Sequence, residues 1–267
     1  MKYKLVVTDI DGTLTNGRRL ISERTKQAVL RFHEMGGIFT LATGRIEDST
    51  RDYYEELRLQ TPVILYNGAK IVNLYHNQCL YEENLDDQHA KEALGVVKDF
   101  PCNALVYFEG KAYVSKINSV IDEYMIKDNI SCIETGDLLS WLKGTPTKIL
   151  IIGSSEDFLP IKEKLNLKCD TKPNMVNSEE TYLEILPIGI SKGNALVKLS
   201  EMLNIPLEQT VAIGDNLNDL EMVARAGLGV AVENAHPGLK KVAKYVTKSN
   251  DQEGVAEILE KIINNEI

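Results

Sequence analysis

The stretch Leu5-Val6-Val7-Thr8-Asp9-Ile10-Asp11-Gly12-Thr13, close to the start of the sequence, decides the fold. A short apolar run such as Leu5-Val6-Val7 is typical of a buried strand in the middle of a parallel sheet. The two carboxylates that follow it stand where open α/β sheets bind their ligands. Asp-Gly is also a common turn pair, so this segment alone leaves a plain turn as a second interpretation.

The composition is that of an ordinary globular protein, with 267 residues of which 43% are hydrophobic and 26% charged. This length allows a large core or two domains. The net charge of −9 argues against a sequence-independent nucleic-acid binder. No apolar stretch approaches the roughly 18 residues that a membrane helix needs, and Asp9 and Asp11 interrupt the only early apolar run. We therefore expect no nucleic-acid partner, no membrane association and no signal peptide.

Cysteines and histidines show no metal-binding or redox spacing. We expect the cysteines to be reduced core residues of a cytoplasmic protein: Cys79, Cys102, Cys132 and Cys169. None of the histidines is assigned to catalysis, and His236-Pro237 predicts a turn: His33, His76, His89 and His236. Three aromatic residues are expected in the core rather than stacked on a substrate: Tyr107, Phe108 and Trp141.

Strands and helices alternate with short joins in the first 68 residues. The pattern predicts helices over 22–33 and 46–57, with Ser22 as a helix N-cap, and strands over 5–7, 38–42 and 63–66. This alternation predicts right-handed βαβ units and a parallel sheet. It resumes with helices over 191–203, 217–226 and 254–263 and strands over 210–213, 229–232 and 245–247.

Between these parts the pattern changes to mixed helices and hairpins. Helices are expected over 86–100, 117–127, 138–142 and 158–165, a hairpin over 104–108 and 112–115, and strands over 148–152, 175–177 and 182–186. We therefore predict an α/β protein with a Rossmann-like parallel-sheet core, residues 1–84 and 188–267, and an inserted α+β domain over residues 85–187.

Four polar segments each end a predicted core strand or begin a core helix, so they should converge on one crevice. They are Asp9-Ile10-Asp11-Gly12-Thr13, Ala42-Thr43-Gly44-Arg45, Ser191-Lys192-Gly193 and Gly214-Asp215-Asn216-Leu217-Asn218-Asp219. In this order and spacing they resemble the four motifs of the haloacid dehalogenase (HAD) superfamily of phosphotransferases. The insertion resembles the C2 (C2B-like) cap of Cof-type sugar-phosphate phosphatases. The similarity spans nearly the whole chain, including Tyr66-Asn67-Gly68-Ala69 and residues 184–193.

The resemblance implies catalytic and metal-binding roles for three acids. Asp9 is expected to be the nucleophile that forms an aspartyl-phosphate, with a role as metal ligand alone as the alternative. Asp11 is expected to act as general acid and then base, while its backbone carbonyl binds the metal; the alternative is a cap of the turn with Gly12. Asp215 would complete a Mg²⁺ site with Asp9, because Mg²⁺ prefers hard oxygen ligands.

Other residues of the motifs would bind phosphate or support the acids. Thr43, the Gly44 amide and Lys192 are expected to bind and neutralise the phosphoryl group, with further contacts from Ile10 and Asn218. A structural cap remains an alternative for Asn218, and Asn67 is expected to support the site. Asp219 either supports the metal ligands and orients Lys192 or is a first-turn helix acid. Arg45 either reaches substrate or pairs with an acid on the surface.

The function expected from this resemblance is Mg²⁺-dependent hydrolysis of small phosphorylated metabolites, sugar phosphates in particular. The insertion would cover the cleft, exclude bulk water and recognise the leaving group. A phosphomutase of the same fold and a non-catalytic ligand-binding protein on this scaffold are the alternatives. The intact set of Asp9, Asp11, Lys192 and Asp215 argues against the second. No motif identifies the substrate or the oligomeric state.

Overall fold

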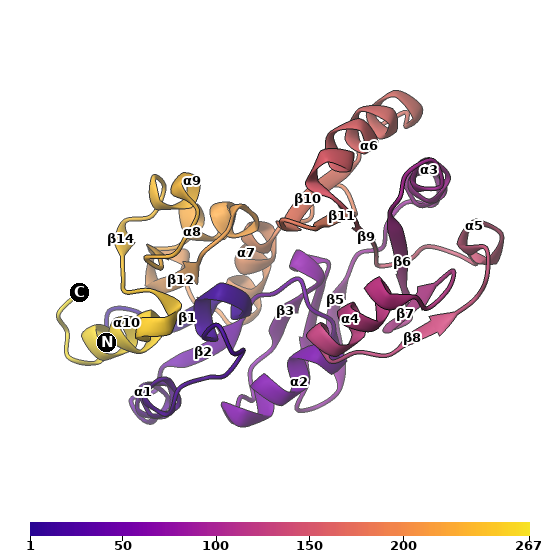
Figure 1. The fold of residues 1–267 in the computed structure, drawn as a ribbon. Helices are drawn as coiled ribbons and strands as arrows, with labels where there is room; N and C mark the ends of the chain where they lie inside the picture. Colours follow the sequence, from indigo (N-terminus) through magenta and orange to yellow (C-terminus); the bar gives the residue numbers. More distant parts are fainter. The chain divides into compact units, whose positions relative to one another are not determined.

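The computed structural model describes residues 1–267, which divide into two compact units (Figure 1). The first unit comprises Met1–Gly44, Thr50–Tyr81 and Ser191–Ile267, and the second comprises Arg45–Ser49 and Glu82–Ile190. The predicted core ended at residue 84 and resumed at residue 188, so each of these boundaries differs by three residues from the observed ones. The assignment of residues 45–49 to the second unit was not predicted.

A parallel sheet of five strands, in the order β14-β13-β12-β1-β2, lies at the centre of the first unit. The strands are β1 (Leu5–Thr8), β2 (Ile38–Leu41), β12 (Thr210–Gly214), β13 (Leu228–Ala231) and β14 (Tyr245–Val246). The predicted α/β fold with a parallel-sheet core is therefore confirmed. The strand order reverses between β1 and β12, which is the switch point where doubly wound sheets bind their ligands.

The third predicted strand is paired differently from the expectation of a parallel sheet. β3 (Val63–Leu65) forms one parallel bridge, between Ala42 and Ile64, and otherwise pairs antiparallel with β4 (Lys70–Asn73). The reason is the turn η2 (Tyr66–Gly68), in which all three residues have positive φ and which reverses the chain. β4 and the next strand of this three-stranded sheet, β5 (Gln78–Glu82), were not predicted.

Helices precede or follow the parallel strands of this sheet. They are α1 (Glu23–Glu34), α2 (Glu47–Glu56), α7 (Lys192–Met202), α8 (Leu220–Arg225), α9 (Pro237–Lys240) and α10 (Gly254–Ile263). Leu5, Leu199 and Met222 belong to one fully buried cluster that joins β1, α7 and α8. Ser22 caps α1 as predicted, since its hydroxyl accepts from the Thr25 N–H. The predicted turn at His236-Pro237 is wrong: His236 is the N-cap of α9.

Single-turn segments complete the first unit. They are η1 (Ile10–Leu14), η3 (Leu207–Gln209), η4 (Leu217–Asp219) and η5 (Asn250–Gln252). Of these, η1 is separated from β1 by one residue, Asp9, and η4 is separated from β12 by two, so both stand at the carboxyl edge of the parallel sheet.

The second unit contains a sheet of six strands in the order β10-β11-β9-β6-β7-β8. The strands are β6 (Asn103–Phe108), β7 (Lys111–Val114), β8 (Cys132–Glu134), β9 (Lys148–Ile152), β10 (Asn174–Glu179) and β11 (Tyr182–Leu186). The predicted hairpin is confirmed: β6 and β7 pair antiparallel around Glu109 and Gly110. β8 was not predicted.

Four helices accompany this sheet: α3 (Asp87–Val97), α4 (Ser119–Asp128), α5 (Leu138–Trp141) and α6 (Ser155–Lys168). α6 is longer than predicted at both ends: Ser154 caps it, so that it begins at Ser155, three residues early, and it continues three residues further, to Lys168. Tyr107 is buried, while Phe108 and Trp141 pack partly buried against the core of this unit. The expectation that these aromatic residues belong to the core therefore holds.

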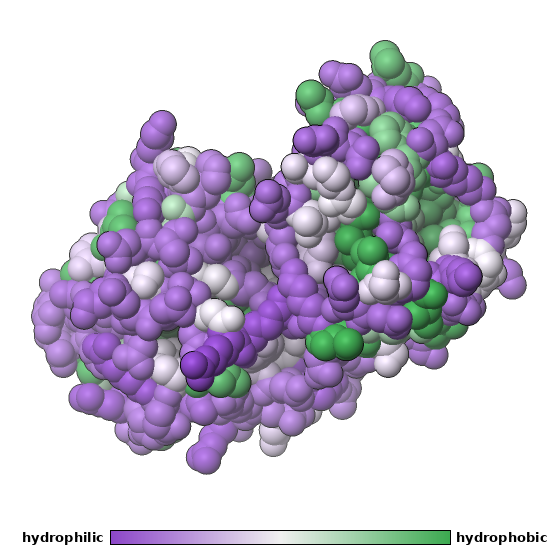
Figure 2. Space-filling model, in the orientation of Figure 1, coloured by the Kyte–Doolittle hydropathy of each residue, from purple (hydrophilic) through white to green (hydrophobic).

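The face of the molecule shown in Figure 2 is mostly hydrophilic. None of the helices combines the length and apolar character that crossing a membrane requires. The cysteines are all free, but the prediction that they lie in the core holds only for Cys169. Cys79 is exposed and Cys102 and Cys132 are partly buried, since their positions carry no strong apolar pattern.

Candidate active site

Asp9 and Asp215 directly follow the two central strands of the parallel sheet. β1 and β12 are neighbours with Thr8 opposite Ile213, and the Asp9 N–H donates to the Ile213 carbonyl at 3.0 Å. Residues at the same end of neighbouring parallel strands lie side by side. The two predicted acids, far apart in sequence, are therefore brought together at the switch point of the sheet.

Lys192, at the first position of α7, supplies a buried positive charge to this group. Its side chain is fully buried, and Nζ donates to Asp9 Oδ1 at 2.6 Å and to Asp219 Oδ1 at 2.7 Å. Charge-assisted hydrogen bonds of this length are among the strongest in proteins. Lys192 is thus held in place from two sides.

Asp219 fixes both Lys192 and the loop after β12. Its second oxygen, Oδ2, accepts from the backbone N–H groups of Asp215 and Asn216 at 3.0 and 3.1 Å. It is also the acidic member of a capping box with Asn216 at the start of η4. Asp219 therefore both caps the first turn of η4 and holds the Lys192 side chain.

Asp215 contacts the first motif through Thr13 and Gly12. The Thr13 hydroxyl donates to Asp215 Oδ1 at 2.7 Å. Gly12 has φ +77°, and a Cβ placed on it would lie only 2.7 Å from Asp215 Oδ2. A side chain at residue 12 would therefore displace this carboxylate. Sequence reasoning assigned no role to Thr13, although its place directly after Asp-Gly could have indicated one.

Burial and mutual repulsion perturb the titration of these groups. Burial raises the pKa of Asp9 well above its usual value of 3.8, although the charge of Lys192 opposes this. Burial and the nearby Asp219 raise the pKa of Asp215 to about 7. Burial lowers the pKa of Lys192, but Asp219 and Asp9 outweigh it, so this pKa is raised. The surroundings of Asp9 and Asp215 thus hold too little positive charge to stabilise their ionised forms fully, while Lys192 stays protonated.

The donor set fits a divalent cation. Carboxylate oxygens from Asp9, Asp215 and Asp219 lie within 4.8 Å of one another. With these acids ionised, Lys192 balances one of three negative charges and leaves two uncompensated. Oxygen ligands are those that Mg²⁺ prefers. Both carboxylate oxygens of Asp219 already accept hydrogen bonds, one from Lys192 and the other from the backbone. Asp9 and Asp215 are therefore the better side-chain ligands.

Asp11 and Ile10 have different surroundings from those acids. Asp11 lies outside the acidic cluster, partly exposed, with its carboxylate 3.9 Å from the guanidinium of Arg19. It is therefore more accessible than Asp9, as a group that exchanges protons with ligand and water should be. Ile10 is fully buried, so only its main chain can contact a ligand.

Thr43 and Gly44 follow β2, beside the strand that carries Asp9. Leu41 lies opposite Thr8, and Thr43 is 1% exposed. The Thr43 N–H donates to the Ile64 carbonyl and its own carbonyl accepts from Asn67 N–H, both at 2.9 Å. The main chain of Thr43 is thus tied to β3 and η2, and Thr43 and Gly44 lie at the carboxyl end of β2, next to the strand that leads to Asp9.

Asn67 and Asn218 contact each other. Asn218 Nδ2 donates to Asn67 Oδ1 at 3.0 Å, and Asn67 is 2% exposed. Asn218 belongs to η4, between Asn216 and Asp219, but the N-cap of this segment is Asn216. The capping alternative for Asn218 is therefore wrong.

Arg45 lies buried, and its Nη1 donates to the Ser49 carbonyl at 3.3 Å. Its burial shows that Arg45 does not lie on the open surface, where the second expectation placed it. The structure does not assign it to the acidic group.

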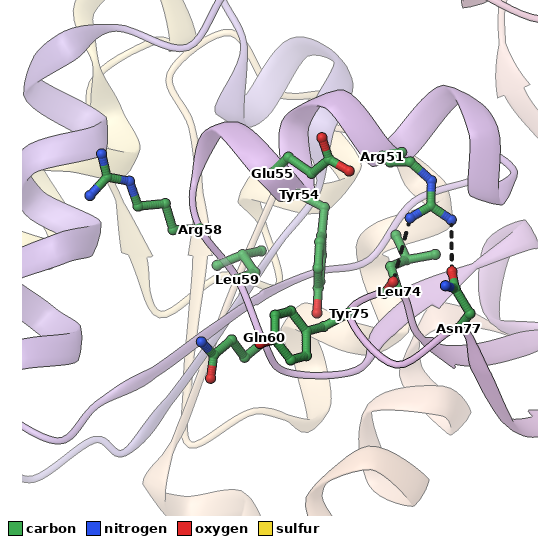
Figure 3. Close-up of a pocket in the computed structure, with 9 residues that line it drawn as sticks. All are labelled: Arg51, Tyr54, Glu55, Arg58, Leu59, Gln60, Leu74, Tyr75 and Asn77. Atoms are coloured by element: carbon green, nitrogen blue, oxygen red, sulfur yellow. Dashed lines mark hydrogen bonds between the residues drawn. The ribbon is translucent and has the colours of Figure 1, made fainter.

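A cavity of about 350 Å³ lies elsewhere in the first unit, between α2 and the turn after β4 (Figure 3). Arg51 crosses its edge and donates to the Leu74 carbonyl and to Asn77 Oδ1. Tyr54 and Tyr75 also line it. None of the predicted site residues contributes to this cavity.

Comparison with known proteins identifies the family. Residues 6–259 match the model of the haloacid dehalogenase-like hydrolases. A 5-amino-6-(5-phospho-D-ribitylamino)uracil phosphatase of Bacillus subtilis is 30% identical, with 97% of each chain covered. A crystal structure of a haloacid dehalogenase-like hydrolase from Bacteroides thetaiotaomicron is 33% identical, with a TM-score of 0.89 and 98% and 100% of the two chains covered.

The fold of the whole chain is shared with further solved structures. A HAD subclass IIB sugar phosphatase superposes with a TM-score of 0.86 at 20% identity, covering 97% of this chain and 98% of its own. The resemblance drawn from the four motifs and the insertion is thereby confirmed. This chain belongs to the haloacid dehalogenase-like hydrolase family and is a phosphatase of that family.

Proposed function

We propose that this chain is a Mg²⁺-dependent phosphatase that hydrolyses small phosphorylated metabolites, sugar phosphates among them, through an aspartyl-phosphate on Asp9. The environment of Asp9 is the observation that carries this proposal. Its Oδ1 is held by Lys192 at 2.6 Å, while Oδ2 has no hydrogen-bond donor and the carboxylate lies beside Asp215. A carboxylate that is oriented by one oxygen and open at the other suits nucleophilic attack.

The proposed reaction has two steps, with Asp9 and Asp11 in complementary roles. In the first, a carboxylate oxygen of Asp9 attacks phosphorus, the bond to the ester oxygen breaks, and Asp11 protonates that oxygen. In the second, a water attacks phosphorus, Asp11 accepts its proton, and the bond to Asp9 breaks to release phosphate. Lys192, Thr43 and Gly44 neutralise and position the phosphoryl oxygens throughout.

Asp9, Asp215 and the Asp11 carbonyl are the proposed ligands of Mg²⁺, with Asp219 and Asn67 in support. When bound, the cation would neutralise charge on the transferred phosphoryl group. Carboxylate oxygens of three acids within 4.8 Å of one another, with Lys192 bonded to only two of these acids, support this assignment.

The inserted segment, residues 85–187, would act as the cap that excludes water and recognises the leaving group. The names of relatives support a small phosphorylated substrate: one acts on a phosphoribitylamino-uracil and another is a sugar phosphatase. Four cysteines that form no disulfide, one of them exposed, support a reducing, cytoplasmic compartment.

The test is phosphate release from a panel of sugar phosphates, nucleotides and 5-amino-6-(5-phospho-D-ribitylamino)uracil, with Mg²⁺ and with EDTA. We expect Mg²⁺-dependent release from one or a few small phosphates and loss of that activity in Asp9→Asn. Asp122→Asn, which removes an exposed carboxylate on α4, is the matched control.

Isomerised sugar phosphate without free phosphate would contradict hydrolysis and favour a phosphomutase. Binding without turnover of any member of the panel would contradict catalysis.

A further inference from the structure

Two buried amide atoms next to the proposed phosphate site have no hydrogen-bond partner. In the contact between Asn218 and Asn67, the amide nitrogen of Asn218 faces the amide oxygen of Asn67. This leaves Asn67 Nδ2 and Asn218 Oδ1 buried and unpaired. Unpaired polar atoms in a protein interior are costly, so such a pair requires an explanation.

The turn that carries Asn67 is fixed in position by the first and third motifs. The Asn67 N–H donates to the Thr43 carbonyl at 2.9 Å. A Cβ placed on Gly68 would lie 2.4 Å from the carbonyl oxygen of Ser191, directly before Lys192. Because the backbone is held on both sides, the remaining freedom of Asn67 is the rotation of its side-chain amide.

The two ends of an amide have nearly the same shape but opposite hydrogen-bonding character. If both amides rotate by half a turn, Asn67 Nδ2 donates to Asn218 Oδ1 and the contact between the residues is kept. The other end of Asn218 then changes from an acceptor to a donor. An acceptor repels a phosphate oxygen, whereas an NH₂ group binds it.

We propose that Asn67 is a positioning residue that sets which end of the Asn218 amide faces the phosphate. With phosphate bound, Asn67 donates to Asn218, and Asn218 turns its NH₂ group to a phosphoryl oxygen. This inference rests on the proposed role of Asn218 in phosphate binding. Because the phosphoryl group is anionic in both the ground state and the transition state, the effect falls on substrate binding more than on the chemical step.

The experiment compares Asn67→Gly, Asn67→Asp and Asn218→Ala, alone and combined. Glycine accepts the left-handed backbone of residue 67, where φ is 55°, and removes the side chain together with its amide. Aspartate also tolerates this backbone, but when ionised it only accepts and would hold the NH₂ group of Asn218 away from phosphate. Asn204→Gly, at an exposed position with φ 53°, controls for the backbone change.

We expect Asn67→Gly to raise KM about tenfold with kcat changed less than about threefold, as for one charge-assisted hydrogen bond. Asn67→Asp should raise KM further, and the Kd of inorganic phosphate, measured by calorimetry with Mg²⁺, should follow KM. In the Asn218→Ala background, Asn67→Gly and Asn67→Asp should raise KM and the Kd of phosphate almost no further.

An unchanged KM in Asn67→Gly, while Asn218→Ala raises it, would overturn this inference and leave the proposed function intact. If Asn67→Asp raises KM as much in the Asn218→Ala background as in the unaltered protein, the inference is also overturned, since the added charge would then act on the phosphate directly. If Asn218→Ala itself leaves KM and phosphate binding unchanged, Asn218 does not bind phosphate and the inference falls with that assignment. Absence of any phosphatase activity in the unaltered protein would instead contradict the proposed function.

Discussion

Lys192→Met tests the structural account of the buried charges. Methionine approximates the length of the lysine side chain but removes the cation that lies between Asp9 and Asp219 at 2.6 and 2.7 Å. Both carboxylates then stay buried without a positive partner. The variant should therefore lose stability as well as activity.

The size of the stability loss follows from the burial of all three groups. Removing one partner of a buried ion pair costs about 3–5 kcal/mol, because the other charge is left without compensation. The raised pKa of Asp9 moderates this cost, since that acid can take up a proton. We expect a loss of about 3 kcal/mol in EDTA at pH 7.5 and a smaller loss with Mg²⁺, which would compensate the same acids.

The assay is urea unfolding followed by circular dichroism, with and without Mg²⁺. Trp141 is the only tryptophan and lies in the second unit, so its fluorescence reports on that unit separately. Lys198→Met, which removes a partly exposed lysine from the same helix, is the matched control and should change stability by less than about 1 kcal/mol. If Lys192→Met without metal also changes the free energy of unfolding by less than about 1 kcal/mol, the reasoning is refuted.

Two further predictions concern Asp215 and Gly12. In EDTA, Asp215 keeps a proton up to about pH 7 in the folded protein but loses it near 3.8 in the unfolded chain, so its contribution to stability should fall as pH rises between these values. The free energy of unfolding of Asp215→Asn, measured in urea, should decline less over that range than that of the unaltered protein. An equal decline would contradict the prediction. Gly12→Ala should raise the Mg²⁺ concentration needed for half-maximal activity at least about tenfold, because its Cβ meets Asp215. Gly110→Ala is the control: residue 110 has φ +75° and open space around it, so this variant should lose only about 1 kcal/mol of stability and no activity. Equal activity profiles of these two alanine variants would show that Gly12 does not shape the acidic group.

The sequence was sufficient to predict the elements with strong local signals. Leu5-Val6-Val7 and Thr210–Ile213 have continuous apolar runs bounded by polar residues, and both are central strands. β4 and β8 were missed because three or four residues with mixed polarity carry little periodic signal. The antiparallel pairing of β3 depends on the left-handed backbone of Tyr66 and Asn67, which propensity does not indicate for a tyrosine.

The site was predictable as a set of motifs, but only part of its contacts was. Spacing placed Asp9, Lys192 and Asp215 at the ends of core elements, and the topology brings them together. The contact of Asp219 with Lys192 was one of two expectations, whereas the amide pair of Asn67 and Asn218, 151 positions apart, was not expected. The buried ion pair of Lys148 and Glu184 in the second unit, at 2.8 Å, had no recognisable signal at all. Such long-range partners are set by tertiary packing rather than by local pattern.

Detection of the covalent intermediate tests the central claim most directly. The Asp11→Asn variant should form the aspartyl-phosphate from an activated ester, whose leaving group needs no proton, and hydrolyse it slowly for lack of a base. Rapid acid quenching after one turnover, followed by peptide mass spectrometry, should find one phosphoryl group on Asp9. Turnover of the ester with no phosphoryl group on Asp9, at times when phosphate release is incomplete, would contradict the account.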